Sequence, residues 1–429
     1  LVDIYVLEMN PDNPNQYRLD DEWRDLEVGE VKLKLKLWGF IPWSVKREVL
    51  RSVHGPALRT EHGVYAIRYA GIDEMKQVEQ WLAMNKAKNF EEWTAAVALN
   101  HIQSFNFVYA NRHGDIHFIH NAQLPVRAPG WNWQQYLPGD RSDLIWQRYH
   151  PTSALPQVTN PASGFVHSAN QTPFNITEPE DNPQPSAVPA DGGWQTRMTN
   201  RATRGLELFA DFEQISFDEA WELKHDNRYS VNYRGIAFLS EVIALPRASD
   251  TVSRAIEILE SWDLGTDKEN RGAALGVCVL AAEWQAESGG TSNPDAQAIL
   301  DDCIDQTLEI GGRLDPRWGD VNRHGRDGTH WPVAGGPDTL RAIYSRRLDG
   351  DDHLTAVAGD GLYYFIRWMP DGEQKVLGTH QYGNDMTDPA SPHYLDQAED
   401  YTNEILHEPL FTADSRRGRI TKQYTVRSD

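Results

Sequence analysis

The run of residues 160–173 holds the side chain best suited to catalysis. It reads as an apolar strand that ends in Asn170, followed by the turn pair Thr172-Pro173. A side-chain amide at the end of a rigid element is a neutral hydrogen-bond donor, and hydrolases direct such donors at the oxygen that becomes negative when a carbonyl is attacked. The run therefore predicts that Asn170 contributes to an oxyanion hole. Ordinary turn chemistry is the alternative, because Asn and Thr-Pro are common turn residues.

Histidines offer a second, weaker kind of site. His113, His117 and His120 are close in sequence, which suggests a metal hydrolase, but in an alternating strand His117 and His120 point to opposite faces. We therefore interpret them as turn and surface residues. His54 and His393 are isolated candidates without an evident partner. The sequence contains no Gly-x-Ser-x-Gly elbow, Walker loop, dinucleotide glycine fingerprint or His-Glu-x-x-His helix.

The elements that position these residues begin with strands. Residues 1–200 carry mainly strand and turn patterns, with a helical stretch at residues 72–97. Residues 107–119 predict a hairpin about a glycine-bearing turn. Residues 131–161 and 178–193 are predicted to be long loops, and loops of this length often shape a site in a compact protein.

Helical periodicity replaces the strand pattern at residues 201–311. Ser249 or Asp250 caps one predicted helix, and Pro294 marks the start of another. After Pro332 the chain returns to strands. This succession of strands, helices and strands predicts an α+β fold rather than alternating βαβ units.

Composition excludes several functions. The 429 residues can bury a large core, and acidic residues outnumber basic ones by 63 to 41, so the net charge of −22 argues against a nucleic-acid partner. No apolar stretch approaches the roughly twenty residues that a bilayer-spanning helix needs, so we expect no membrane span and no membrane role. The fifteen tryptophans keep open a carbohydrate-binding protein, although most are expected to fill the core.

The two cysteines fall on apolar stripes of helical patterns. Core packing is the plain interpretation of Cys278 and Cys303, and a disulfide across a helix hairpin in an oxidising compartment is the alternative. The sequence opens at Leu1, inside a strand pattern, with neither Met nor a signal segment. We interpret it as a processing product or a fragment.

Several segments, in order along nearly the whole chain, resemble the β subunit of the penicillin acylase family of N-terminal-nucleophile hydrolases. The chain is most similar to the branch that contains acyl-homoserine lactone acylases and aculeacin-type acylases. Each motif is modest, and their order and spacing carry the assignment. The matching segments are Val53-His54-Gly55-Pro56 and residues 65–71, 89–93, 106–110, 114–116, 124–127, 160–173, 335–342, 359–360, 380–383 and 391–397.

The resemblance implies the αββα four-layer sandwich of these hydrolases, an α+β fold, with a helical insertion. We expect a β-rich core portion at residues 1–204, a helical insertion region at 205–345, and strands returning to the core with a C-terminal segment at 346–429. The resemblance also implies amide-bond hydrolysis by an acylase. In this family a precursor cuts itself, and the freed N-terminal Ser attacks with its own α-amino group as base.

The expected serine is not in this chain, because the family pattern places roughly seventy residues of the β subunit upstream. The implied partners are the α subunit and the N-terminal β segment of the same precursor, and the chain alone is expected to be inactive. The implied substrate is a small acylated amide, and the chemistry requires no cofactor. Relatives are exported, which implies a periplasmic or secreted setting and a role in quorum quenching or antibiotic resistance.

The resemblance also assigns individual site residues. The resemblance assigns Asn170 to the oxyanion-hole asparagine and Arg201 to an arginine that supports the site through hydrogen bonds. The alternative for Arg201 is a helix-start surface residue that pairs with an acid. Some relatives hold a structural calcium at positions that match Asp3 and Asp181, with the Val2 carbonyl as a third oxygen. Calcium takes roughly six to eight oxygens, so this set is a beginning.

Substrate choice stays open at this level. Long-chain acyl-homoserine lactones are the favoured class, followed by lipopeptide or β-lactam side chains. Gln171 follows Asn170 where relatives often have a second Asn or a small polar residue, which leaves the acyl preference undecided. A catalytically degenerate acylase-like binding protein would carry the same motifs, since pocket residues rather than the fold decide function.

Overall fold

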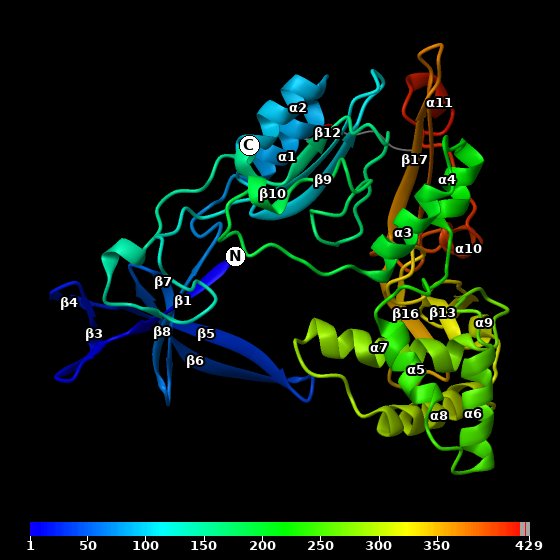
Figure 1. Cartoon of the computed structure of the whole chain (residues 1–429), viewed down its shortest axis with the longest axis horizontal. Coiled ribbons are helices and arrows are strands. Elements are labelled where there is room, and N and C mark those ends of the chain that lie inside the picture. Colours follow the sequence, from blue (N-terminus) through cyan, green and yellow to red (C-terminus); the bar gives the residue numbers. More distant parts are fainter. Residues whose placement is uncertain (421–424, 426–429) are drawn as a thin grey trace. The chain divides into compact units, whose positions relative to one another are not determined.

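The computed structural model describes residues 1–420 and residue 425 (Figure 1), so the end of the predicted segment 346–429 lies outside the described residues. The chain forms two compact units, Leu1–Arg197 and Met198–Asp429. The predicted succession of strands, helices and strands is confirmed. The three-part division at residues 204 and 345 stays a prediction. No helix among the described residues is long and apolar enough to cross a membrane.

The larger sheet of the first unit has six strands in the order β11-β1-β8-β7-β6-β5. Alternation in β1 buries Asp3, Tyr5 and Leu7, and Tyr5 joins the apolar core of this sheet. The strands of this sheet are β1 (Val2–Leu7), β5 (Glu27–Leu37), β6 (Ile41–Ser52), β7 (Gly55–Thr60), β8 (Gly63–Tyr69) and β11 (Leu137–Pro138). A small sheet comprises β2 (Met9–Asn10), β3 (Asn13–Leu19) and β4 (Glu22–Asp25).

A second sheet in the same unit, in the order β12-β10-β9, packs against two helices. Trp93 and Val97 share a core with Phe107 and Ile119, and Asn89 caps the second helix. The predicted hairpin and helical stretch are therefore confirmed. The elements are α1 (Gln77–Lys86), α2 (Phe90–Val97), β9 (Ser104–Ala110), β10 (Ile116–Ala122) and β12 (Gln157–Thr159), and the predicted long loops contain the 3-10 turns Ser142–Leu144, Thr152–Ala154 and Pro185–Ala187.

Helices fill the first half of the second unit. Ser249 caps α6 as predicted, while α8 begins at Ala296 with Asp295 as its cap, slightly beyond Pro294. Helices α5 to α8 enclose one apolar core. The helices are α3 (Asn200–Ala210), α4 (Phe217–Lys224), α5 (Gly235–Ile243), α6 (Asp250–Ser261), α7 (Ala273–Ser288), α8 (Ala296–Gly311) and α9 (Trp318–Val321).

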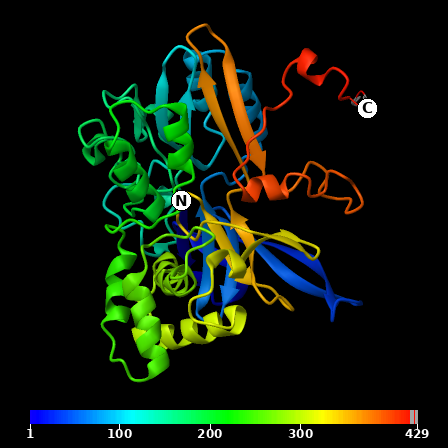
Figure 2. The same ribbon diagram turned by 90° about the vertical axis from the view of Figure 1, so that its right-hand side faces the viewer.

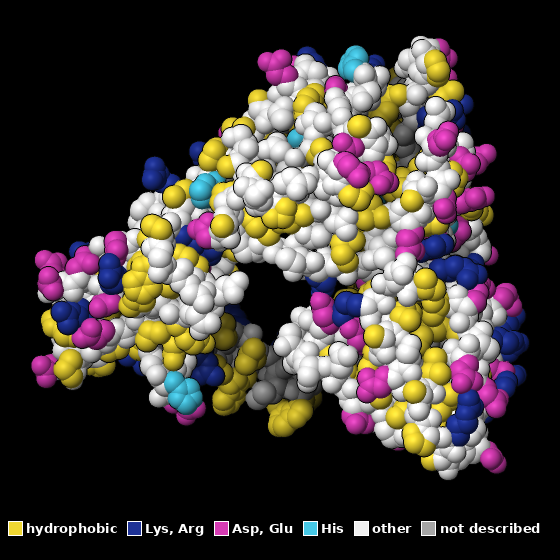
Figure 3. Space-filling model, viewed as in Figure 1, with side chains coloured by type: hydrophobic (Ala, Val, Ile, Leu, Met, Phe, Trp, Pro, Cys, Tyr) yellow, Lys and Arg dark blue, Asp and Glu magenta, His cyan; other side chains and the backbone are white. Residues whose placement is uncertain are grey.

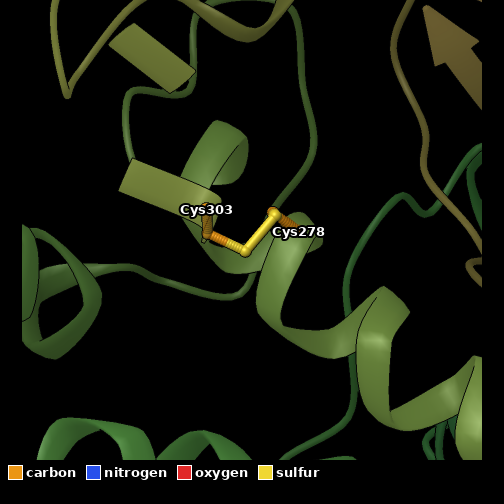
Figure 4. The surroundings of a disulfide bond; sticks show 2 residues. All are labelled: Cys278 and Cys303. Carbon is orange, nitrogen blue, oxygen red and sulfur yellow. A yellow bond between two sulfur atoms is a disulfide. The ribbon is translucent and has the colours of Figure 1, made fainter. Parts of the chain in front are cut away.

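The cysteines join two of these helices. Cys278 of α7 and Cys303 of α8 form a disulfide, with their Cα atoms 5.8 Å apart (Figure 4). This separation lies in the range that a disulfide requires. Of the two interpretations left open by the sequence, the disulfide is the one that the structure contains.

Strands complete the second unit, and they start earlier than predicted. A hairpin turns at Asp327 and Gly328, both with positive φ, so the return to strands precedes Pro332; Asp-Gly is a hairpin signal that the sequence analysis overlooked. Figure 2 shows the long β17–β18 hairpin in orange. The elements are β13 (Asn322–Arg326), β14 (Thr329–Pro332), β15 (Ile343–Arg347), β16 (Leu354–Gly359), β17 (Leu362–Trp368), β18 (Gln374–His380), α10 (Ala398–Thr402) and α11 (Ala413–Arg416).

Candidate active site

The loop that follows β12 presents Asn170. Residues 160–173 do not form the predicted strand, because Asn160 and Gly164 adopt φ values of 48° and 78°, and left-handed backbone interrupts a strand. Asn170 also lies in the left-handed region, at φ 63°, and it is exposed. Asn enters this region more readily than most residues. The strand prediction was wrong, yet the amide is displayed at the surface of its unit.

The side chain of Gln171 holds the apex of this loop. Its Oε1 accepts a hydrogen bond from the Ala169 backbone N–H at 2.6 Å. Its Nε2 donates to the carbonyls of His167 and Asn175 at 3.0 and 3.2 Å. Gln171 is only 2% exposed, so these bonds replace water for groups that would otherwise be buried without partners. The backbone on both sides of Asn170 is therefore fixed.

Further bonds tie the two limbs of the loop together. Asn182 accepts from the N–H groups of Ile176 and Thr177 at 2.7 and 3.2 Å, and its amide donates to the Thr177 carbonyl. The Thr177 hydroxyl donates to the Phe165 carbonyl, and the His167 N–H donates to the Ile176 carbonyl. A loop built in this way is a rigid support for a donor, which electrostatic stabilisation of an oxyanion requires.

Asp3, the first predicted calcium ligand, already accepts hydrogen bonds from a cationic and a neutral side chain. Its Oδ1 accepts from Arg127 Nη2 at 2.7 Å, and its Oδ2 accepts from Arg127 Nε at 3.2 Å and from Trp146 Nε1 at 2.8 Å. The residue is buried within β1. A bidentate guanidinium already neutralises this carboxylate and would repel a divalent cation.

The other two predicted ligands have different neighbours. Asp181 is half-buried, and its Oδ2 accepts from the Ser163 N–H at 2.8 Å. Val2 lies opposite Tyr69 in the six-stranded sheet. As arranged, these donors do not fit calcium, and the part of the chain that the structure describes contains no cluster of three acidic, His or Cys side chains suited to a metal. The calcium stays a prediction.

Arg201 lies in the first turn of α3, in the second unit. Its Nε donates to Asp338 Oδ1 at 3.0 Å. Asp338 is buried, and its Oδ2 accepts from the Asn200 N–H at 2.7 Å. This is the helix-start ion pair that the sequence analysis gave as the alternative for Arg201. A supporting role at the site stays a prediction, because Asn170 and Arg201 belong to different units.

The three clustered histidines do not converge. His117 Nδ1 lies 2.7 Å from the Thr159 hydroxyl, whereas His120, on the other face of β10, has its Nδ1 2.7 Å from Asn106 Oδ1. Burial lowers the pKa of each of these two histidines to about 4. His113 is exposed in the turn as predicted, but the surface interpretation was wrong for His117, which is 1% exposed because it packs within the sheet. The metal-hydrolase interpretation therefore has no support among the described residues.

The isolated histidines have structural surroundings. His54 is fully buried, its ring centroid lies 4.6 Å from that of Tyr5, and burial lowers its pKa to about 4. His393 is exposed and pairs with Asp396 at 2.8 Å. The Nδ1 of His54 lies 3.3 Å from the hydroxyl of Ser52, which is itself buried.

The fold and these motifs define a family. The family model for penicillin amidases matches residues 1–418, and the chain therefore belongs to the penicillin amidase family. A solved structure, the thermostable penicillin G acylase from Alcaligenes faecalis, superposes with a TM-score of 0.62 at 18% identity, covering 100% of this chain and 86% of that one. The predicted α+β fold of the N-terminal-nucleophile hydrolases is thereby confirmed.

Two relatives align with this chain over only part of their own length. Penicillin G acylase from Escherichia coli is 26% identical over 273 residues, which cover 61% of this chain and 30% of that protein. The acyl-homoserine lactone acylase PvdQ from Pseudomonas fluorescens is 22% identical over 478 residues, covering 99% of this chain and 61% of that protein. The chain thus spans less than two thirds of the length of these relatives.

Sequence reasoning missed two residues that build the local geometry. Gln171 was treated as a variable neighbour of Asn170, although its polar character next to a proline turn agrees with a buried loop-closing amide. Asp338 was noted only within a family motif. The Pro337-Asp338 pair is a turn signal, and Asp338 has a φ of 60°.

Proposed function

We propose that this chain is part of an acylase that hydrolyses the amide bond of an N-acyl substrate. The observation that carries the proposal is Asn170, exposed in left-handed backbone on a loop that Gln171 closes, within a chain of the penicillin amidase family. A neutral donor on a fixed support suits the stabilisation of an oxyanion.

In the proposed reaction an N-terminal Ser, contributed by another segment of the same protein, attacks the substrate carbonyl. Its α-amino group takes the hydroxyl proton, and the Asn170 amide donates to the oxygen that becomes negative. The carbon–nitrogen bond then breaks, the proton passes to the leaving amine, and water hydrolyses the acyl-enzyme to a carboxylic acid. Arg201 contributes through the conformation of the α3 start, where it holds Asp338.

Acyl-homoserine lactones are the proposed substrates. Support comes from the relative named as an acyl-homoserine lactone acylase, which aligns with 99% of this chain. Lipopeptide or β-lactam side chains are the second class, supported by the relatives named as penicillin G acylases. A degenerate, purely binding protein remains the rival from outside the enzymes.

We also propose a periplasmic or secreted location and association with an α subunit from the same precursor. The disulfide between Cys278 and Cys303 supports an oxidising compartment. Calcium binding would require Asp3 to exchange Arg127 for the ion. If it does so, dialysis against a chelator should lower the melting temperature, and added calcium should restore it. An unchanged melting temperature would contradict it.

The test of the acylase proposal uses the complete protein that contains this chain. Asn170→Ala and Asn170→Gly should each lower kcat at least about a hundredfold on an acyl-homoserine lactone. The glycine variant keeps the left-handed backbone without strain, so its loss of turnover would report the amide rather than misfolding.

Asn160→Gly is the matched control, since Asn160 is also exposed with positive φ at the start of the same loop. It should keep kcat near the wild-type value. Wild-type turnover in Asn170→Gly would remove Asn170 from the mechanism. Complete inactivity of the wild-type protein on N-acyl substrates, together with retained tight binding, would favour the degenerate binding protein.

A further inference from the structure

The hairpin formed by β5 and β6 extends beyond the rest of its sheet. The two strands pair with each other from Glu27–Arg51 to Leu37–Ile41, but β6 pairs with β7 only at Leu50 to Ser52. Residues 30–48, here called the arm, therefore form a two-stranded ribbon, drawn in dark blue in Figure 1. An isolated ribbon buries little of itself, so both of its faces are available to a partner.

One face of the arm is basic. Residues 31–47 contain five basic and no acidic side chains, within a chain whose net charge is −22, and all but Arg47 lie on this face. Glu30 and Glu48 lie on the same face at the base of the arm, where Lys46 pairs with Glu30 at 2.7 Å. Lys32, Lys34 and Lys36 alternate along β5 and so share a face, and Lys32 stands opposite Lys46 on β6. None of Lys32, Lys34 and Lys36 has an ion-pair partner among the described residues.

The other face and the tip are apolar. Leu33 and Leu35 of β5 and Trp43 of β6 are each exposed by roughly half, and Leu35 stands opposite Trp43. At the turn, Trp38 and Phe40 are 80% and 74% exposed. Figure 3 shows hydrophobic side chains gathered along this hairpin. Two aromatic rings this exposed on an apolar ribbon mark an interaction surface.

We propose that the arm binds the surface of an anionic lipid bilayer. An amphipathic element with Trp, Phe and Leu on one side and Lys on the other lies in the membrane interface, with its apolar face toward the acyl chains and its lysines at the level of the headgroups. Basic residues near an anionic leaflet add an attraction that salt weakens. An anionic bilayer satisfies both features of the arm at once, the exposed apolar side chains and the lysines without ion-pair partners.

This binding is peripheral, and it revises the expectation that the chain has no membrane role. It is independent of the proposed acylase activity, because none of the arm residues belongs to the Asn170 loop. The arm would hold the protein at a surface where amphiphilic N-acyl compounds accumulate.

The test is a flotation assay with the complete protein that contains this chain and two kinds of vesicle, one of pure phosphatidylcholine and one containing one-quarter phosphatidylglycerol. Binding should be at least about tenfold stronger to the anionic vesicles, and higher salt should weaken it. The triple variant Lys32→Glu, Lys34→Glu, Lys36→Glu should lose most of this binding. The double variant Trp38→Ser, Phe40→Ser should weaken binding to a similar extent.

Two control variants make the same change in charge and in polarity at exposed positions outside the arm. Lys76→Glu, Lys86→Glu, Lys88→Glu reverses three exposed lysines at α1, and Met75→Ser, Val78→Ser removes two exposed apolar side chains there. Both controls should bind anionic vesicles like the wild-type chain. Equal binding to both vesicle types, or equal losses in the arm and control variants, would overturn the proposal. A wild-type dimer that dissociates in the Trp38/Phe40 variant without any vesicle binding would assign the arm to a second copy instead.

Discussion

Asn170 and Gln171 are neighbours in sequence with opposite environments: Asn170 is exposed at φ 63°, whereas Gln171 is 2% exposed and bonded to three backbone groups. The buried amide of Gln171 bonds the backbone on both sides of Asn170, and this backbone presents the exposed amide of Asn170. A buried side chain can therefore govern where a neighbouring hydrogen-bond donor lies.

Replacing Gln171 should test this dependence. Gln171→Leu removes three hydrogen bonds and leaves buried backbone groups without partners, so we expect a loss of about 2 kcal/mol in the free energy of unfolding. In the complete enzyme, kcat should fall as well. Urea denaturation and steady-state kinetics measure the two effects. Gln135→Leu, on an exposed glutamine of the same unit, should change neither. An unaltered unfolding curve for Gln171→Leu would mean that the hydrogen bonds of Gln171 do not stabilise the loop.

The ion pair between Arg201 and Asp338 should matter for stability. Asp338→Ala would remove the acceptor of the half-buried Arg201 guanidinium and of the buried Asn200 N–H, so we expect a loss of about 2 kcal/mol in the free energy of unfolding. Chemical denaturation of the chain checks this value. The exposed bidentate pair of Arg141 with Asp143 is the comparison, because solvent screens it, and Asp143→Ala should leave the denaturation midpoint where it is. Equal effects at the two pairs would contradict the assignment.

The disulfide closes a loop with a sequence separation of 25 residues between α7 and α8. Its loss removes a constraint on the unfolded chain, so Cys278→Ser with Cys303→Ser should lower the free energy of unfolding by about 3 kcal/mol. Thermal denaturation with and without a reductant measures the effect. The reductant should destabilise the wild-type chain and leave the double variant unaffected, and sensitivity of the variant to reductant would point to a different cause.

Acid should destabilise the fold through its buried histidines. Burial lowers the pKa of His54 from 6.5 to about 4, so the unfolded chain takes up a proton at a higher pH than the folded chain does. Stability from this residue is complete above pH 6.5 and is lost as the pH falls toward 4, by about 1 kcal/mol per pH unit. Urea denaturation between pH 7 and about 5 gives the slope. His54→Gln should flatten it, while His113→Gln, at an exposed position, should not.

Patterns of local periodicity accounted for most of the fold. Alternation predicted the hairpin about residues 111–115, and helical spacing with a cap at Ser249 predicted α6. These predictions succeed because one buried face fixes each element. The family resemblance supplied what periodicity cannot, namely how the strands assemble into sheets.

The Asn170 loop shows where local reasoning fails. Phe165 and Val166 read as a strand, but Asn160, Gly164 and Asn170 take positive φ, and side chains such as that of Thr177 bond to the loop backbone instead of a neighbouring strand. The predicted calcium site shows a second limit of reasoning from local sequence. Asp3 has the right chemistry for a hard cation, and only the structure reveals that Arg127 reaches it from 124 residues away.

One bond links the displayed amide to the end of its unit. The Thr172 N–H donates to the carbonyl of Arg197 at 3.0 Å, and Arg197 is the last residue of the first unit. Engineering of this protein by circular permutation, linker extension or insertion of a reporter domain near residue 197 would thus act on the backbone two residues from Asn170. Such redesigns belong elsewhere in the sequence, because this junction shares a hydrogen bond with the loop that carries Asn170.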